Sequence, residues 1–187
     1  MTDYVKLANL LYPDCKCSVE DIEKKFPKRE LPEGACVTRL APSPTGFVHL
    51  GNLFPAMTSE RLAHQSGGTF ILRIEDTDQK REVEGAVGML LSSLERYNII
   101  FDEGATANGE KGNYGPYYQR QRAEIYQAFA KKLISEGKAY PCFCSEERLE
   151  EMRKEQESLK ENFGYYGKYA SCRNLSYEEI EEKVKNG

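Results

Sequence analysis

The hydrophobic positions between residues 35 and 97 switch between strand spacing and helix spacing. In one expected strand, Phe70, Leu72 and Ile74 alternate so that they share one face. The pattern predicts a strand over 35–40, a helix over 50–65, a strand over 69–74 and a helix over 84–97. Strand, helix, strand and helix within about 60 residues indicate a βαβ unit on a parallel sheet.

Pro55 lies inside the helix expected over 50–65. A proline in a helix interior lacks the N–H that closes the backbone hydrogen bond, and its ring crowds the preceding turn. In the first turn that N–H has no partner within the helix. We therefore expect the regular helix to start late, near Pro55.

Short helices are expected on either side of this unit. The N-terminal residues 3–11 have helical spacing, and Ser18 with Asp21 resembles a capping box that opens a second helix, which Pro27 ends. The expected C-terminal elements are a loop over 101–118, a helix over 120–136, a strand over 139–144, a helix capped by Ser145, a loop over 163–174 and a helix opened by Ser176 with Glu179. The residues expected on the inner face of the helix over 120–136 are Ile125, Tyr126, Phe129 and Leu133.

Composition narrows the class of protein. The 187 residues are 40% hydrophobic and 30% charged, with a net charge of −4, which is a globular composition and too acidic for a protein that coats nucleic acid. The mean hydropathy of −0.65 indicates a polar surface. The apolar stretches are too short to cross a membrane, and Asp3 breaks any secretory signal, so we expect a cytoplasmic protein with no membrane partner.

The segment 39–52 carries the candidate chemistry. A strand ends at Leu40, and a loop stiffened by prolines leads into a helix, so the loop lies where ligands bind in open α/β sheets. Gly51 would let a ligand approach the backbone, and the free N–H groups at the helix start suit a phosphate. His49 can donate a hydrogen bond to a phosphoryl oxygen. The segment matches neither GxxxxGK[ST] nor GxGxxG.

This string, Arg39-Leu40-Ala41-Pro42-Ser43-Pro44-Thr45-Gly46-Phe47-Val48-His49-Leu50-Gly51-Asn52, resembles the nucleotide-binding signature of class I aminoacyl-tRNA synthetases. More narrowly, it resembles the glutamyl-tRNA synthetases, with residues 49–52 in place of the "HIGH" motif. The resemblance extends through residues 67–78, Arg81, Gly85, 101–104 and 115–122, and covers 36–187.

The resemblance implies an α/β fold. Residues 35–118 would form the first half of a Rossmann-like parallel-sheet nucleotide-binding domain. Residues 119–187 would begin the α+β insertion that binds the tRNA acceptor end, and residues 1–34 would be a helical extension. The class closes on ATP with a Lys-rich "KMSKS"-type loop, and no such string follows Thr77. We therefore expect an N-terminal fragment of the catalytic domain that is inactive alone.

The resemblance also implies a reaction. Glutamate attacks the α-phosphorus of ATP, which is bound with Mg²⁺, and the glutamyl group of the resulting adenylate passes to the 3′ end of tRNA(Glu). The enzyme would be a monomer. Two related alternatives stay open: a glutamyl-queuosine tRNA(Asp) synthetase, and a non-catalytic zinc-bearing nucleotide-binding module. A glutaminyl enzyme is disfavoured, because it has Glu-Pro-Asn-Gly in place of residues 43–46.

Site residues follow by the same resemblance. Arg39 would bind a carboxylate of glutamate, Ala41 and Ser43 would line that pocket, and Glu75 would take the ammonium group. The residues assigned to ATP are Thr45, Gly46, His49, Gly51 and Asn52, of which His49 and Gly51 would be catalytic. Asp78 and Arg81 would either contact the tRNA acceptor end or merely cap a turn, and Asp76 has the same structural alternative.

The six cysteines suggest a reducing compartment, where close pairs more often bind metal than form disulfides. Cys142, Cys144 and Cys172 could hold a structural zinc ion, which takes four tetrahedral ligands. Relatives that the segment resembles use a histidine or a tyrosine as the fourth ligand. The histidine position is Asn174 here, which leaves Tyr165 as the candidate and Tyr169 as a second possibility. The alternative is that these cysteines are reduced and buried, and this is the interpretation we prefer for Cys15, Cys17 and Cys36.

Overall fold

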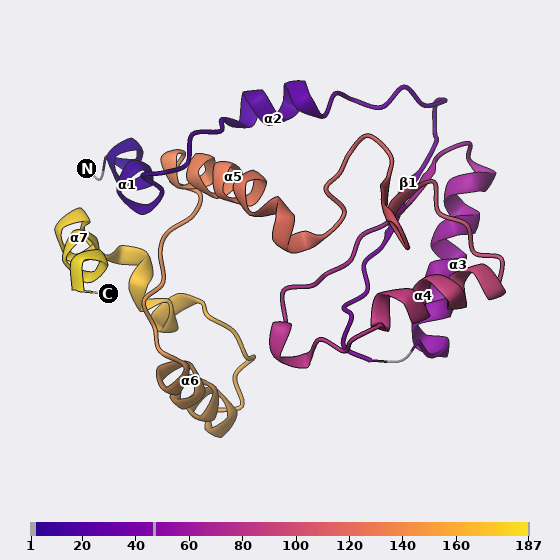
Figure 1. The fold of residues 1–187 in the computed structure, drawn as a ribbon. Helices are drawn as coiled ribbons and strands as arrows, with labels where there is room; N and C mark the ends of the chain where they lie inside the picture. Colours follow the sequence, from indigo (N-terminus) through magenta and orange to yellow (C-terminus); the bar gives the residue numbers. More distant parts are fainter. Residues whose placement is uncertain (1–2, 47, 187) are drawn as a thin grey trace. The chain divides into compact units, whose positions relative to one another are not determined.

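The structure is a computed structural model that describes residues 3–46 and 48–186. The chain forms two compact units. One unit contains residues 20–126, and the other combines residues 3–19 with residues 127–186 (Figure 1). The functional boundaries expected at residues 34 and 118 stay a prediction.

The unit of residues 20–126 is built on a four-stranded sheet in the order β1-β2-β3-β4. Its strands are β1 (Val37–Leu40), β2 (Thr69–Leu72), β3 (Glu103–Thr106) and β4 (Gly109–Lys111). The first three strands run parallel, and β4 pairs antiparallel with β3. The parallel sheet is confirmed, whereas the loop expected over 101–118 is wrong where β3 and β4 form.

Gly104 explains why β3 was not visible in the sequence pattern. The backbone of Gly104 has φ +148°, and a Cβ added there would lie 2.3 Å from the carbonyl oxygen of Leu72. Only glycine therefore lets β3 approach β2 at this point. A glycine in the strand interior removes the alternation on which strand prediction depends.

Helices α3 (Leu50–Gln65) and α4 (Ala86–Arg96) share one hydrophobic core with the sheet. Phe70, Leu72 and Ile74 are at most 1% exposed, which confirms their predicted common burial. Ala56 and Ala63 are fully buried, and these small residues allow α3 to lie close to β1 and β2.

The expectation that α3 starts late is wrong, because the helix begins at Leu50 and runs through Pro55. Pro55 lies in the second turn, so its missing N–H leaves only the carbonyl group of Gly51 without its bond within the helix.

The N-terminal helices agree with the prediction. Helix α1 (Tyr4–Leu11) is capped by the Asp3 carboxylate, which accepts the N–H groups of Val5 and Lys6. Helix α2 (Val19–Lys25) ends before Pro27.

The other helices are α5 (Ala123–Ser135), α6 (Glu146–Ser158) and α7 (Tyr177–Asn186). Single turns of 3₁₀ helix occur at η1 (Gln79–Arg81), η2 (Gln119–Arg122), η3 (Gly167–Tyr169) and η4 (Ser171–Asn174). As predicted, Ser145 caps α6, and Ser176 with Glu179 forms a reciprocal capping box at α7.

Two predictions for the C-terminal part are wrong. Residues 139–144 form no strand, because Ala139 and Phe143 pack against a cluster of helical residues instead of a neighbouring strand. That cluster has Leu7, Ala8, Ile134 and Ile180 at its centre. The predicted inner face of α5 is also wrong: the buried residues are Ala128 and Ile134, whereas Tyr126, Phe129 and Leu133 are 39%, 41% and 45% exposed.

Candidate functional site

A cavity of about 270 Å³ opens at the carboxyl end of β1. Residues of the loop after β1, the N-terminal parts of α3 and α4, and Ile74 line it. The lining contains both polar and apolar groups and includes Ser43, Thr45, Gly46, His49, Asn52, Ile74, Val87 and Leu90. Four of the residues predicted to bind glutamate or ATP do not line this cavity: Arg39, Ala41, Gly51 and Glu75. Ala41 lies half-buried next to the end of β1.

His49 is the N-cap of α3 and is held by a reciprocal pair of hydrogen bonds. Its Nδ1 accepts the N–H of Gly51 at 3.1 Å, and the side-chain oxygen of Asn52 accepts the N–H of His49 at 3.2 Å. The N–H groups of Asn52 and Leu53 both donate to the His49 carbonyl. The expectation of free N–H groups is therefore wrong at residues 51–53, because this cap uses them.

The cap also fixes the tautomer of the His49 ring. Because Nδ1 accepts a hydrogen bond, the neutral ring carries its proton on Nε2. The ring is exposed at the cavity, and its Nε2 has no hydrogen-bond partner among the described residues, so this nitrogen is available as a donor. A donor at this position suits an oxygen that gains negative charge.

Gly51 makes room for that ring. A Cβ added at Gly51 would lie 2.8 Å from His49 Cε1 and 2.9 Å from His49 Nδ1. Both distances are shorter than Cβ atoms tolerate, so the absence of a side chain at Gly51 allows the His49 ring to fold over the helix start.

Arg39, near the carboxyl end of β1, lies beside Glu75, which is three residues beyond the end of β2. Arg39 Nη1 and Arg73 Nη2 each lie 3.1 Å from the same oxygen, Glu75 Oε1. The side chains are 42%, 21% and 32% exposed for Arg39, Arg73 and Glu75. The hydrogen bonding between β1 and β2 continues beyond the two strands, since the N–H of Glu75 donates to the carbonyl of Pro42. Two guanidinium groups on one carboxylate leave an excess of positive charge, which suits a second carboxylate.

Sequence reasoning missed Arg73. Arg73 is the first residue after β2, so the sequence placed it near the sheet edge. The sequence pattern did not show that its side chain would point toward Glu75. Its Nε is buried and has no hydrogen-bond partner among the described residues.

The two aspartates that follow Glu75 form separate ion pairs. The buried Asp76 accepts the backbone N–H of Arg120 at 3.0 Å and its Nε at 2.9 Å, and therefore fixes the start of η2. Burial raises the pKa of the Asp76 carboxyl, but the hydrogen bonds from Arg120 outweigh burial and leave the pKa below its ordinary value. Asp78 caps η1 and binds Arg81 Nε at 2.6 Å. Asp78 and Arg81, for which either a tRNA contact or a capped turn was expected, thus pair with each other at a capped turn.

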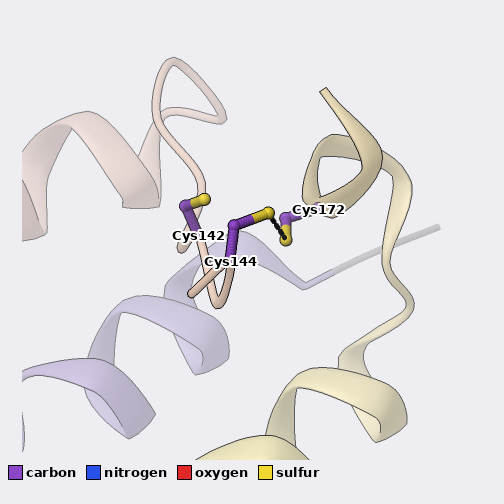
Figure 2. A group of neighbouring side chains, drawn as sticks. All are labelled: Cys142, Cys144 and Cys172. Carbon is purple, nitrogen blue, oxygen red and sulfur yellow. Dashed lines mark hydrogen bonds between the residues drawn. The ribbon is translucent and has the colours of Figure 1, made fainter. Parts of the chain in front are cut away.

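The unit of residues 3–19 and 127–186 contains a cysteine cluster. The sulfur atoms of Cys142, Cys144 and Cys172 all lie within 4.8 Å of one another, and those of Cys144 and Cys172 are 3.8 Å apart (Figure 2). The Tyr165 hydroxyl lies 3.4 Å from Cys144 Sγ and accepts the Cys172 N–H. Tyr169 lies elsewhere, because its hydroxyl donates to Glu155 and Glu161.

The Cys144–Cys172 and Cys144–Tyr165 distances fit the edges of a tetrahedral zinc site. With Zn–S bonds of about 2.3 Å and Zn–O bonds of about 2.0 Å, a tetrahedron has an S···S edge of about 3.8 Å and an S···O edge of about 3.5 Å. Burial raises the pKa of the Cys172 thiol, but its contacts with Tyr165 and the Phe143 N–H outweigh burial and lower the pKa to about 7. A thiol that ionises this readily suits a metal ligand, since metals bind the thiolate. The three cysteines could therefore hold a metal ion.

The remaining cysteines are not part of this cluster. Cys15 and Cys17 donate weak hydrogen bonds to nearby carbonyl groups, and Cys36 lies immediately before β1 with its thiol toward the Gly34 carbonyl. All three are half-buried, so the expectation that they are buried is only partly met, and Cys36 is not a strand residue.

A family model described as "tRNA synthetases class I (E and Q), catalytic domain" matches residues 35–187. The chain belongs to this family. The match includes the loop after β1, the His49 cap and the end of β2, so the site described above lies within the catalytic domain of these glutamyl and glutaminyl synthetases.

Relatives of this family support the assignment over nearly the whole chain. A glutamate–tRNA ligase of Acetivibrio thermocellus is 62% identical over 98% of this chain, and one of Clostridium perfringens is 52% identical over 98%. The chain covers 34% of either relative, so it spans about a third of their length.

A solved structure gives the same result for the fold. The glutamate–tRNA synthetase of Elizabethkingia anophelis is 33% identical and superimposes with a TM-score of 0.71 over 81% of this chain and 31% of that chain.

No helix within residues 3–46 and 48–186 has the length and apolarity that crossing a bilayer requires.

Proposed function

We propose that this chain is part of a cytoplasmic, monomeric glutamate–tRNA ligase. The enzyme activates glutamate with ATP and Mg²⁺ and transfers it to tRNA(Glu). The observation that carries the proposal is the charge arrangement of Arg39, Arg73 and Glu75 at the edge of the sheet. The names of the relatives support it, because each relative described above is a glutamate–tRNA ligase.

Glutamate would bind by exchanging one ion pair for two. In the free protein Arg39 pairs with Glu75 at 3.1 Å. The substrate carries an ammonium group and two carboxylates, so it replaces this pair by placing its ammonium group on Glu75 and its side-chain carboxylate on Arg39. Ser43 and the backbone of Ala41 complete the pocket. Arg73 keeps Glu75 in place during the exchange.

ATP would lie at the cavity beside the His49 cap. Thr45, Gly46, Gly51 and Asn52 surround the nucleotide, and the glutamate α-carboxylate attacks the α-phosphorus while pyrophosphate leaves. His49 Nε2–H donates to a phosphoryl oxygen as negative charge moves toward the leaving group. This role needs the Nε2–H tautomer, which the Gly51 N–H selects by donating to Nδ1.

The remaining site residues would act on tRNA and on stability. Asp78 and Arg81 lie exposed or half-buried on η1, and we propose that they contact the acceptor end of tRNA. Cys142, Cys144, Cys172 and Tyr165 would hold a structural Zn²⁺ ion that ties residues 142–144 to residues 165–172. This ion would supply folding energy and no chemistry.

ATP–pyrophosphate exchange with tRNA present tests the proposal. A full-length synthetase that contains this chain should exchange pyrophosphate when glutamate is supplied and should fail with glutamine. The 187-residue chain alone should be inactive in the same assay. Glutamine-dependent exchange would contradict the substrate assignment, and activity of the chain alone would contradict the expectation that it is catalytically incomplete.

A further inference from the structure

The segment before the family match has no role in the proposed function, yet part of it packs closely onto the sheet unit. The family model matches from residue 35, whereas the compact unit begins at residue 20. The Tyr114 hydroxyl donates to the carbonyl of Pro27 at 2.8 Å, and the rings of Phe26 and Tyr114 stack at 6.2 Å. We call residues 26–29 the strap.

Arg29 makes the strongest contact of the strap. Its two terminal nitrogens bind both oxygens of Glu103, at 2.5 and 2.7 Å, in a bidentate pair. The side chains are 17% and 14% exposed, and the guanidinium lies 3.7 Å above the Tyr114 ring. The hydrogen bonds raise the pKa of Arg29 and lower that of Glu103, so the pair stays ionised. A bidentate, half-desolvated pair holds geometry better than a surface ion pair.

Glu103 passes this restraint to the substrate site. Glu103 Oε2 also accepts the hydroxyl of Tyr117 at 2.8 Å. The main chain of Tyr117 accepts the N–H of Ile74, and Gln119 N–H donates to the carbonyl of Ile74, both at 2.9 Å. Ile74 is the residue immediately before Glu75. A continuous set of contacts thus runs from the strap to the backbone next to Glu75, whose carboxylate pairs with Arg39.

We propose that Arg29 is a positioning residue: the strap, through Glu103 and Tyr117, holds the backbone at Ile74 so that Glu75 is aimed at the substrate ammonium group. The role of Glu75 in this inference rests on the proposed function. The restraint on Ile74 does not, because it follows from contacts within the sheet unit alone.

Amide hydrogen exchange on this chain, followed by NMR, tests the restraint. Arg29→Ala should accelerate exchange of the Ile74 and Gln119 amides by about tenfold, which corresponds to about 1.4 kcal/mol of local opening free energy. The Thr69 amide, which donates to Cys36 at the other end of β2, should not change. The matched control is Arg96→Ala, which removes an exposed arginine from the last turn of α4.

Arg29→Lys is the second variant, for use if Arg29→Ala does not fold. It should give a smaller acceleration at the same two amides, because an ammonium group cannot bind both Glu103 oxygens in the bidentate geometry of a guanidinium. Unchanged exchange at Ile74 and Gln119 overturns the inference, and so does equal acceleration at Thr69.

The substrate link is tested in a full-length synthetase that contains this chain. Arg29→Lys should raise KM for glutamate by less than about tenfold and leave KM for ATP unchanged. Faster amide exchange with an unchanged KM for glutamate would overturn the positioning role while the proposed function stands. Absence of glutamate-dependent activity in the unmodified enzyme would overturn the proposed function. The amide exchange experiment would still show whether Arg29 restrains the backbone at Ile74.

Discussion

Gly51 gives the clearest prediction, because the structure assigns it a local role that differs from direct contact with ATP. In Gly51→Ala, the new Cβ would start 2.8 Å from His49 Cε1, whereas ordinary contact begins at 3.4 Å. The difference requires the His49 ring to move by at least about 0.6 Å. The movement breaks the bond from Gly51 N–H to Nδ1, which selects the Nε2–H tautomer.

The effect on stability should be small, because two contributions offset each other. Loss of the cap costs about 1 kcal/mol, and alanine gains about 0.5–1 kcal/mol over glycine within a helix. The effect on catalysis should be larger, since small misplacements of a reacting group cost up to about 10²-fold in rate. We expect kcat for ATP–pyrophosphate exchange to fall about tenfold to a hundredfold, while the free energy of unfolding of this chain changes by less than about 0.5 kcal/mol.

A double-mutant cycle separates the two roles of Gly51. If Gly51 acts through the ring, then adding Gly51→Ala to His49→Ala should cost nothing further. His49→Ala alone should lower kcat more than it raises KM for glutamate. Gly88→Ala is the matched control, because that glycine is exposed in α4 with open space around it. Losses that multiply in the double variant would refute the ring mechanism and indicate that Gly51 contacts the nucleotide directly.

Three further predictions concern metal, pH and backbone. Metal analysis of the purified chain should find about one zinc per chain, and Tyr165→Phe should weaken zinc retention against a chelator; zinc far below one per chain would contradict the site. The carboxylate of Asp76 has a lowered pKa, so it stabilises the fold above the pKa of the unfolded chain, about 3.9, and this contribution is lost as pH falls below about 4. Asp76→Asn should therefore lower the midpoint of chemical unfolding more at pH 7 than at pH 3; an equal effect at both would contradict this linkage. Gly104→Ala should destabilise the chain by more than about 2 kcal/mol, because its Cβ would collide with the backbone of Leu72, and a neutral result would contradict the tight β2–β3 contact.

Features whose cause is local could be predicted from the sequence. The capping box of Ser176 and Glu179 and the cap at Ser145 formed as expected, because these bonds span only three residues. The buried alternation of Phe70 and Leu72 also sufficed to identify β2.

Features that depend on distant partners could not be predicted in the same way. Strand β3 depends on a close approach to Leu72 that only Gly104 permits. The buried face of α5 is set by small and aliphatic residues, Ala128 and Ile134, instead of its aromatic residues.

The candidate site shows the same division. The signature loop and its histidine were evident in the sequence, but the pairing of Arg73 with Glu75 depends on where the side chains turn after β2. The resemblance gave Tyr165 as the candidate beside the cysteines and Tyr169 as a second possibility, and only the structure separates them, with the Tyr165 hydroxyl 3.4 Å from Cys144 Sγ.

Transfer of labelled glutamate to tRNA tests the central claim most directly. A full-length synthetase that contains this chain, supplied with ATP and Mg²⁺, should attach glutamate to the 3′ end of tRNA(Glu), and the charge reversal Glu75→Lys should abolish transfer by repelling the ammonium group of the substrate. Transfer to tRNA(Asp) alone would indicate an enzyme of the glutamyl-queuosine type. Absence of transfer to any tRNA would indicate a non-catalytic module and would contradict the account.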